Sequence, residues 1–148
     1  MKLDETDRSI LNMLQEDARR SFKEMSKKVG VSEATVFVRV RKLVKEGVIK
    51  SFRATINPTL VGKGTLAFVL LRANPSEYAE ALERLSEMDD VYEIYDITGP
   101  NYAILKVRME SPEKLAGLID RIGAIKGVIS TETAMALRIV KEEPVIKL

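Results

Sequence analysis

The pattern of hydrophobic and polar positions predicts three short helices in the first third of the chain. Apolar side chains recur there at intervals of three and four residues, which places them on one face of a helix. We expect helices that end near residues 17, 29 and 46, with the inward-facing side chains Ile10, Leu11, Leu14, Met25, Val29, Val36, Val40 and Leu43. The residues that follow, 48–56, have the composition of a β-segment.

Residues that favour helix ends mark the limits of these helices. Asp4 is a suitable N-cap for the first helix, and Ser21 and Glu24 have the spacing of a capping box at the start of the second. Gly30 ends the second helix, and a single residue separates it from Ser32, the next N-cap. Such a short turn between two helices is typical of a helix-turn-helix.

After residue 57 the pattern changes to alternating strands and helices. Asn57 and Pro58 break the pattern, and glycines follow. We expect strands over residues 66–73, 91–98, 102–109 and 128–140, and helices that begin at Ser76 and at Ser111-Pro112. The order strand, helix, strand, strand, helix, strand is that of the split βαβ arrangement. The sequence therefore predicts an α+β protein with two domains, residues 1–57 with a β linker and residues 58–148.

The net charge of +2 conceals an uneven distribution of charge along the chain. Residues 1–57 contain 13 lysines and arginines and 8 acidic residues, whereas residues 58–148 contain 11 and 14. Most of the excess lies within residues 18–53, which hold 11 cationic and 3 acidic side chains. A basic first domain indicates a nucleic-acid partner, and a solvated helical surface is the alternative interpretation.

The absence of cysteine and histidine narrows the classes of function. It removes disulfides, thiolate nucleophiles, imidazole bases and the common zinc ligands. An active site built from carboxylates alone is the alternative, but most enzyme mechanisms lose their usual residues, so we expect no enzyme activity, no metal and no cofactor. The longest apolar run, residues 66–71, is far shorter than the roughly 20 residues that span a bilayer. Asp4, Glu5 and Asp7 occupy the place of the positive region of a signal peptide. We therefore expect a cytoplasmic protein without a membrane partner.

The third predicted helix is the candidate reader of double-stranded DNA, because a recognition helix enters the major groove with its N-terminal turns. Ser32 and Thr35 can hydrogen-bond base edges or phosphates, and Glu33 can accept from cytosine N4. The cationic side chains further along are expected where phosphates run. They are Arg41, Lys42 and Lys45, followed by Lys50 and Arg53 on the β-segment that would form a wing.

Three residues of this helix have two interpretations each. If Val36 and Val40 face the core, Phe37 and Val38 point outward and can contact thymine methyl groups. The alternative is that these two side chains pack against the preceding helix or a partner subunit. Arg39 either contacts a phosphate or pairs with an acidic residue of the first helix and supports the fold.

This arrangement resembles the Lrp/AsnC (feast/famine) family of regulators. In the first domain the resemblance rests on residues 3–11, 31–36, 39–43 and 47–49. In the second domain it rests on residues 91–93, Thr98-Gly99, Tyr102, Gly127-Val128 and residues 131–133. The resemblance spans nearly the whole chain. It implies a transcription regulator with an N-terminal winged helix-turn-helix DNA-binding domain and a C-terminal ferredoxin-like regulatory and oligomerisation domain.

The resemblance also implies an assembly and an effector. Subunits of this family pair as dimers through face-to-face sheets, and dimers often assemble into octamers, so that two recognition helices meet successive half-sites. The effector is usually an amino acid bound between C-terminal domains, near the loop after the second strand and the start of the last strand. The candidate effector-binding residues are Gly99, Asn101, Tyr102, Asp120, Thr131 and Thr133.

One residue of the candidate effector loop departs from the family pattern. Many members carry an acidic residue after the glycine, where its carboxylate helps to hold the amino group of the ligand, and this chain has Pro100. Proline carries no charge and donates no hydrogen bond. The alternative interpretation is a plain hairpin turn at Gly99, with Asp120 a solvated helix residue and the two threonines ordinary strand residues.

Four functions are compatible with some of these features. The first, which we expect, is a sequence-specific DNA-binding transcription regulator with an amino-acid effector, and the second is an effector-independent regulator or architectural DNA-binding protein. The third is an enzyme, because some Lrp-like proteins are sirohaem decarboxylases. That chemistry needs cationic or imidazole groups, and this chain lacks histidine and keeps a basic recognition helix. The fourth is a small-molecule or assembly module with a vestigial first domain, against which the charge of residues 18–53 argues.

Overall fold

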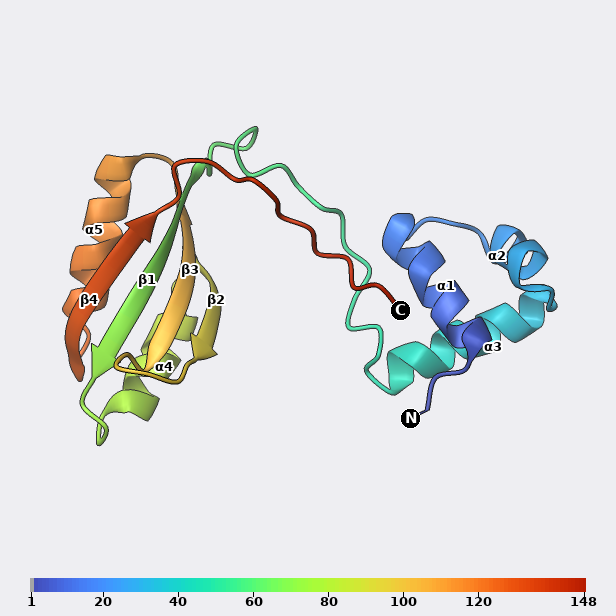
Figure 1. Cartoon of the computed structure of the whole chain (residues 1–148), viewed down its shortest axis with the longest axis horizontal. Helices are drawn as coiled ribbons and strands as arrows, with labels where there is room; N and C mark the ends of the chain where they lie inside the picture. The colour runs from blue at the N-terminus through green and yellow to red at the C-terminus, as the bar shows by residue number, and fades with distance from the viewer. Residues whose placement is uncertain (1) are drawn as a thin grey trace. The chain divides into compact units, whose positions relative to one another are not determined.

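The structure is a computed structural model that describes residues 2–148, and the chain divides into two compact units (Figure 1). The first unit contains the described residues up to Thr55 together with Lys141–Leu148, and the second contains Ile56–Val140. The predicted division after residue 57 left residues 141–148 in the second domain, whereas the structure groups them with the first unit. Hydrogen bonds join Ile146 and Leu148 of this segment to the first helix.

The first unit consists of three helices, α1 (Glu5–Glu16), α2 (Phe22–Val29) and α3 (Glu33–Lys45). The predicted helix starts are confirmed: Asp4 and Ser21 each complete a capping box, and the Ser32 hydroxyl accepts a hydrogen bond from the backbone N–H of Thr35. Gly30 has a φ of 72°, so the left-handed turn that the sequence assigned to it is present.

The core of the first unit lies where the three helices meet. Ile10 of α1, Met25 of α2, and Val36 and Leu43 of α3 are fully buried there. These are positions that the helical periodicity placed inward, and Leu14 and Val29 pack against them as partly buried side chains. The three helices are therefore held together by one small apolar cluster, which fixes the angle between α2 and α3.

Residues 48–56 do not form the expected strand. They follow a turn at Gly47 and form neither helix nor strand. The four strands of the sheet in the described residues all come from later parts of the chain. The physical reason is that a strand is stable only when a neighbour satisfies its backbone hydrogen bonds. The side chains of Val48, Phe52 and Ile56 are exposed. The segment therefore has the composition of a strand but no neighbouring strand to pair with.

The second unit is a four-stranded antiparallel sheet with two helices on one face (Figure 1). Its elements are β1 (Thr65–Ala73), α4 (Tyr78–Ser86), β2 (Val91–Asp96), β3 (Ala103–Met109), α5 (Pro112–Gly123) and β4 (Val128–Met135). The strand order β2-β3-β1-β4 and the βαββαβ sequence confirm the predicted ferredoxin-like α+β fold.

The core of the second unit lies between the sheet and its two helices. Every second residue of β1 from Ala67 to Ala73 is fully buried, and Leu85 of α4 and Leu118 and Ile122 of α5 pack against that face. β1 lies between β3 and β4, and its buried face accounts for every second residue of the apolar run that the sequence shows there.

Two sequence-based limits in the second unit are wrong. The last strand ends at Met135 rather than near residue 140, because the chain beyond it has no strand partner. Ser76 does not cap α4: its hydroxyl donates to the Asn74 side chain, and the helix begins after Glu77 without a side-chain cap. By contrast, Ser111 caps α5 and Pro112 is its first residue, as predicted.

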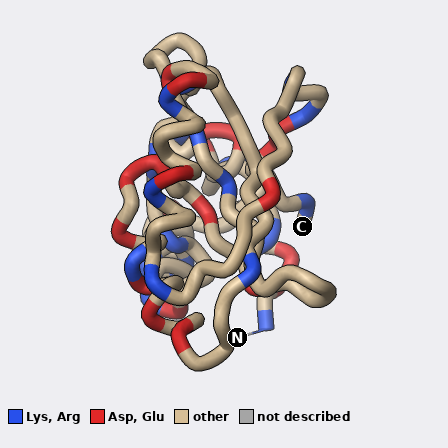
Figure 2. Tube along the Cα trace, turned by 90° about the vertical axis from the view of Figure 1, so that its left-hand side faces the viewer, with Lys and Arg blue, Asp and Glu red and all other residues tan. Residues whose placement is uncertain are grey.

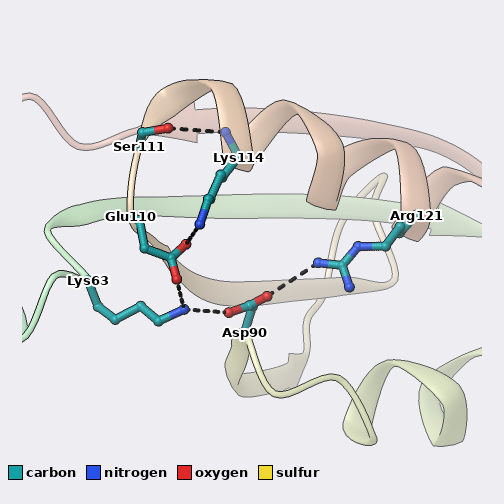
Figure 3. A network of polar contacts seen from close by, with 6 residues as sticks. All are labelled: Lys63, Asp90, Glu110, Ser111, Lys114 and Arg121. Carbon is teal, nitrogen blue, oxygen red and sulfur yellow. Dashed lines mark hydrogen bonds and ion pairs between the residues drawn. The ribbon is translucent and has the colours of Figure 1, made fainter.

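A network of charged groups ties the loop before β1 to the rest of the second unit. Figure 2 colours the lysines and arginines and the acidic residues along the whole chain, and Figure 3 shows the residues of this network from close by. The Lys63 ammonium lies 2.9 Å from Asp90 and 2.7 Å from Glu110, and Arg121 of α5 lies 3.2 Å from the other Asp90 oxygen. The hydrogen bond from Lys63 lowers the pKa of Glu110 to about 2. The network therefore holds the entrance of β1 in place.

Candidate nucleic-acid interface and effector site

The turn between α2 and α3 has the geometry that a recognition helix requires. The backbone N–H groups of Gly30 and Val31 both donate to the Ser26 carbonyl, at 2.9 and 3.2 Å, and close the end of α2. Ser32 begins the next helix directly after this turn. Only Gly30 and Val31 therefore separate α2 from the Ser32 cap, and Glu33 at the start of α3 is exposed.

The polar residues at the leading end of α3 are partly engaged with one another. The Ser32 hydroxyl lies 2.8 Å from the Thr35 hydroxyl and accepts a hydrogen bond from the Thr35 N–H at 3.1 Å. Only one of the two hydroxyl hydrogens is used in the contact between them, so one donor remains for an outside acceptor. Glu33 is exposed beside them. These three predicted site residues form one polar patch at the helix start.

Phe37 is held between two neighbours on the exposed face of α3. Its ring and the Phe22 ring form a T-shaped pair with centroids 5.7 Å apart, and the Arg41 guanidinium lies 5.6 Å from the Phe37 centroid. Phe37 thus packs against the first residue of α2, yet 43% of its surface is still exposed, and Val38 beside it is 63% exposed. The sequence carried no signal for the contribution of Phe22.

Arg39 supports the fold of the first unit. Its guanidinium lies 2.7 Å from an Asp4 carboxylate oxygen and 2.8 Å from one of Asp7, which confirms the pairing with the first helix that the sequence left open. The hydrogen bond to Asp4, followed by that to Asp7, raises the pKa of Arg39. The Asp7 backbone N–H, followed by Arg39, lowers the pKa of the Asp4 carboxyl. Arg39 therefore fixes α3 against the start of α1.

The remaining cationic side chains of this region point into solvent. Arg41, Lys42 and Lys45 occupy the last turns of α3, and Lys50 and Arg53 follow in the segment without secondary structure. None of the ion pairs found among residues 2–148 involves any of these five. Positive charge that is not engaged in an ion pair is suited to a polyanionic ligand.

The candidate effector loop is a hairpin that two neighbouring elements secure. Gly99 has a φ of 114°, which favours glycine strongly, and Asn101 is half-buried. The Tyr102 N–H donates to Leu71 on β1, and the Tyr102 carbonyl accepts from Ile97, so the hairpin closes on itself. Gly99, Asn101 and Tyr102 are neighbours in the sequence, and the backbone of Tyr102 attaches this hairpin to β1.

Tyr78 of α4 also secures this hairpin, although no sequence pattern singled this residue out. Its ring centroid lies 5.3 Å from that of Tyr102, and its hydroxyl donates to the Asp96 carboxylate and lies 3.1 Å from the Tyr102 carbonyl. Burial, reinforced by the hydrogen bond to Asp96, raises the pKa of Tyr78 to about 12. Tyr78 therefore stays protonated and keeps the loop against α4.

The other predicted effector residues lie apart from the hairpin in the single chain. Thr131 and Thr133 of β4 pair with Leu71 and Val69 of β1, whereas Tyr102 of the hairpin hydrogen-bonds Leu71 from the other side of β1. Two strand spacings, about 10 Å, therefore separate Thr131 from Tyr102. Asp120 is exposed on α5. Among the described residues no acidic cluster is suited to hold a metal ion, and none of the helices is long and apolar enough to cross a membrane.

Comparison with known proteins gives two family matches. Residues 3–50 match the winged helix-turn-helix DNA-binding family, and residues 66–146 match the Lrp/AsnC ligand binding domain. The HTH-type transcriptional regulator FL11 of Pyrococcus abyssi is 37% identical over 142 residues, which cover 96% of this chain and 94% of FL11. FL11 of Pyrococcus horikoshii is 38% identical over 140 residues, which cover 95% of this chain and 93% of that protein.

Solved structures agree with these matches over the full length of the chain. AsnC of E. coli superposes with a TM-score of 0.94 at 33% identity, and the alignment covers all of both chains. The leucine response regulatory protein LrpA of Mycobacterium tuberculosis superposes with a TM-score of 0.87 at 30% identity, covering 99% of this chain and all of LrpA.

Proposed function

The chain belongs to the Lrp/AsnC family of transcriptional regulators, and on that basis we propose that it binds specific DNA sequences and responds to an amino acid. It carries a helix-turn-helix DNA-binding domain and a ligand-binding domain, each with its own core. The observation that carries the proposal is the exposed face of α3, where a capped polar start precedes cations without acidic partners. Such a face suits the major groove and its flanking phosphates.

In this proposal the residues of α3 divide between base contacts and phosphate contacts. Ser32, Glu33 and Thr35 lie at the helix start, which enters the groove first, and contact base edges. Arg41, Lys42 and Lys45 neutralise phosphates, and Lys50 and Arg53 reach the flanking backbone. Two copies of this surface in a dimer would engage half-sites about one helical turn apart.

The exposed apolar pair on α3 would give the protein a preference for thymine. Phe37 and Val38 present apolar surface beside the polar start of the helix, and the thymine methyl group is the apolar feature of the major groove. Loss of such a contact lowers affinity only for sequences that carry the methyl group, and replacement of thymine by uracil removes the same group from the DNA.

Phe37→Ala should therefore relax base preference at one or two positions, each by about 1–3 kcal/mol. The measurement is binding to a set of duplexes, derived from the preferred one, with single base-pair changes or thymine-to-uracil replacements. Phe22→Ala serves as a control, because it removes the packing of Phe37 without removing its ring. A Phe37→Ala protein with unchanged base preference would exclude the contact with thymine methyl groups.

The effector site we propose lies between C-terminal domains of neighbouring subunits. The hairpin with Gly99, Asn101 and Tyr102 offers a close backbone approach and polar groups, and Asp120, Thr131 and Thr133 would complete the site across the assembly. The family match to a ligand-binding domain over residues 66–146, and a structural relative named as a leucine response protein, support an amino-acid ligand.

A second candidate function, regulation without an effector, is favoured by Pro100. This residue follows the loop glycine and supplies no charge for a ligand amino group. The two candidates differ in one measurement: binding of the full chain to DNA from its own upstream region, with and without a pool of the twenty amino acids. A shift in affinity supports the effector, and the pool can then be divided. An unchanged affinity favours the effector-free regulator.

A further inference from the structure

A segment that the DNA-binding surface does not use returns to the first helix. Residues 141–148, which we call the return segment, run extended beside α1 and belong to the first unit. The Gln15 side-chain amide donates to the Ile146 carbonyl at 2.8 Å, and its oxygen accepts from the Ile146 N–H at 2.8 Å. Asn12, one turn earlier on α1, donates to the Leu148 carbonyl at 3.3 Å.

The Gln15 contact has the form of a backbone pairing. A carboxamide presents one donor and one acceptor side by side, so it can satisfy both the N–H and the C=O of one residue, as a facing residue does in an antiparallel sheet. Gln15 and Asn12 are half-buried, whereas the Ile146 side chain is 69% exposed. The segment is thus held through its backbone, and its side chains contribute little to the contact.

The return segment also changes how the two units are connected. The chain passes from the first unit to the second after Thr55 and comes back after Val140. With the segment docked, the second unit is joined to the first at both of its ends, and residues 56–140 form a closed loop. A second connection of this kind removes conformational freedom from the free protein.

We propose that the Asn12–Gln15 face of α1 is a docking surface for the return segment, and that docking restrains the DNA-binding unit so that two such units can engage neighbouring half-sites together. The proposal rests on the DNA binding proposed above. A restrained unit loses less freedom when the second half-site is bound, which raises the effective concentration of the second recognition helix. Binding to one half-site does not depend on this restraint.

The docking itself is tested by hydrogen exchange at the Ile146 amide in the full chain. Its N–H should be protected in the parent protein, and Gln15→Leu should reduce that protection at least about tenfold, because both hydrogen bonds are removed. Glu16→Gln, a neighbouring exposed change on α1, should leave the protection intact. An Ile146 amide that exchanges equally fast in the parent and the Gln15→Leu protein overturns the docking surface.

The coupling is tested with two duplexes from the upstream region of the gene, of about 10 and about 30 base pairs, which accommodate one and two recognition helices. Gln15→Leu should weaken binding of the longer duplex about tenfold relative to the shorter one. Because Gln15→Leu also changes α1 itself, a second variant acts on the return segment alone. Ile146→Pro removes the backbone donor of that segment and leaves α1 unchanged, and it should weaken binding of the longer duplex in the same way.

The outcomes separate this inference from the proposed function. If the parent protein fails to bind either duplex, the proposed function fails, while the protection of Ile146 still reports the docking. If the parent protein binds both duplexes and both variants bind them in the parent ratio, the coupling is overturned. A selective loss on the longer duplex in both variants supports it.

Discussion

Replacing both Arg41 and Lys45 by alanine should weaken DNA binding at least about a hundredfold at about 0.1 M salt. The slope of log K against log salt concentration should also become shallower, by about two for each recognition helix. Each cation that neutralises a phosphate releases counterions, which is worth about tenfold in affinity at that salt concentration. Both side chains are exposed, and neither takes part in an ion pair among the described residues. Arg41 contacts the exposed Phe37 ring, which lies outside the core, so removal of the two side chains should leave the core of the first unit intact.

The measurement is a set of binding isotherms at several salt concentrations on more than one DNA sequence. The loss should be similar on all sequences, because phosphate contacts carry no base information. Arg84→Ala with Arg138→Ala removes the same charge from exposed positions of the second unit and serves as the control. If this control loses as much affinity as the Arg41 and Lys45 variant, net charge rather than the α3 surface governs binding.

Gly127→Ala should destabilise the second unit by about 2–4 kcal/mol. Gly127 has a φ of 91°, which side chains rarely adopt, and a Cβ there would lie 2.6 Å from the Glu77 Cβ. The Gly127 carbonyl also accepts the hydrogen bond of Asn74 at 2.7 Å, so the backbone has little room to shift. The strain would fall at the entrance of β4, which pairs with the central strand β1.

Calorimetry of the full chain would measure this loss as a lower unfolding temperature of the second unit, by at least about 8 °C. Gly117→Ala is the matched control, because Gly117 lies within α5 with open space around its Cα. Alanine there should be neutral or should stabilise the helix by about 0.5–1 kcal/mol. A Gly127→Ala protein as stable as the Gly117→Ala protein would contradict the close packing of residue 127 against Glu77.

The parts of the fold that were predictable from sequence are those that depend on local chemistry. Asp4, Ser21, Ser32 and Ser111 cap helices through groups within three residues of themselves, and their sequence context was sufficient to place them. The apolar run of β1 was similarly informative, because a central strand is enclosed by two neighbours and two helices.

The features that were missed depend on partners far away in the sequence. The β-like segment 48–56 and the end of the last strand needed a pairing partner that composition does not reveal. Gln15 and Ile146 are 131 residues apart, and an isolated glutamine gives no sign of such a contact. Within the candidate sites, Phe22 packs against Phe37 and Tyr78 packs against Tyr102. The members of each pair are distant in the sequence, and folding brings them together.

The central claim, that α3 and the basic residues around it bind DNA, is tested most directly by the salt dependence of binding. The full-length protein would be titrated onto DNA from its own upstream region at about 50 and about 200 mM salt. If a dimer uses the cations of both recognition helices, its affinity should fall about a thousandfold or more between these conditions. An affinity that stays the same at both salt concentrations would contradict the claim, because no phosphate contacts would then be made.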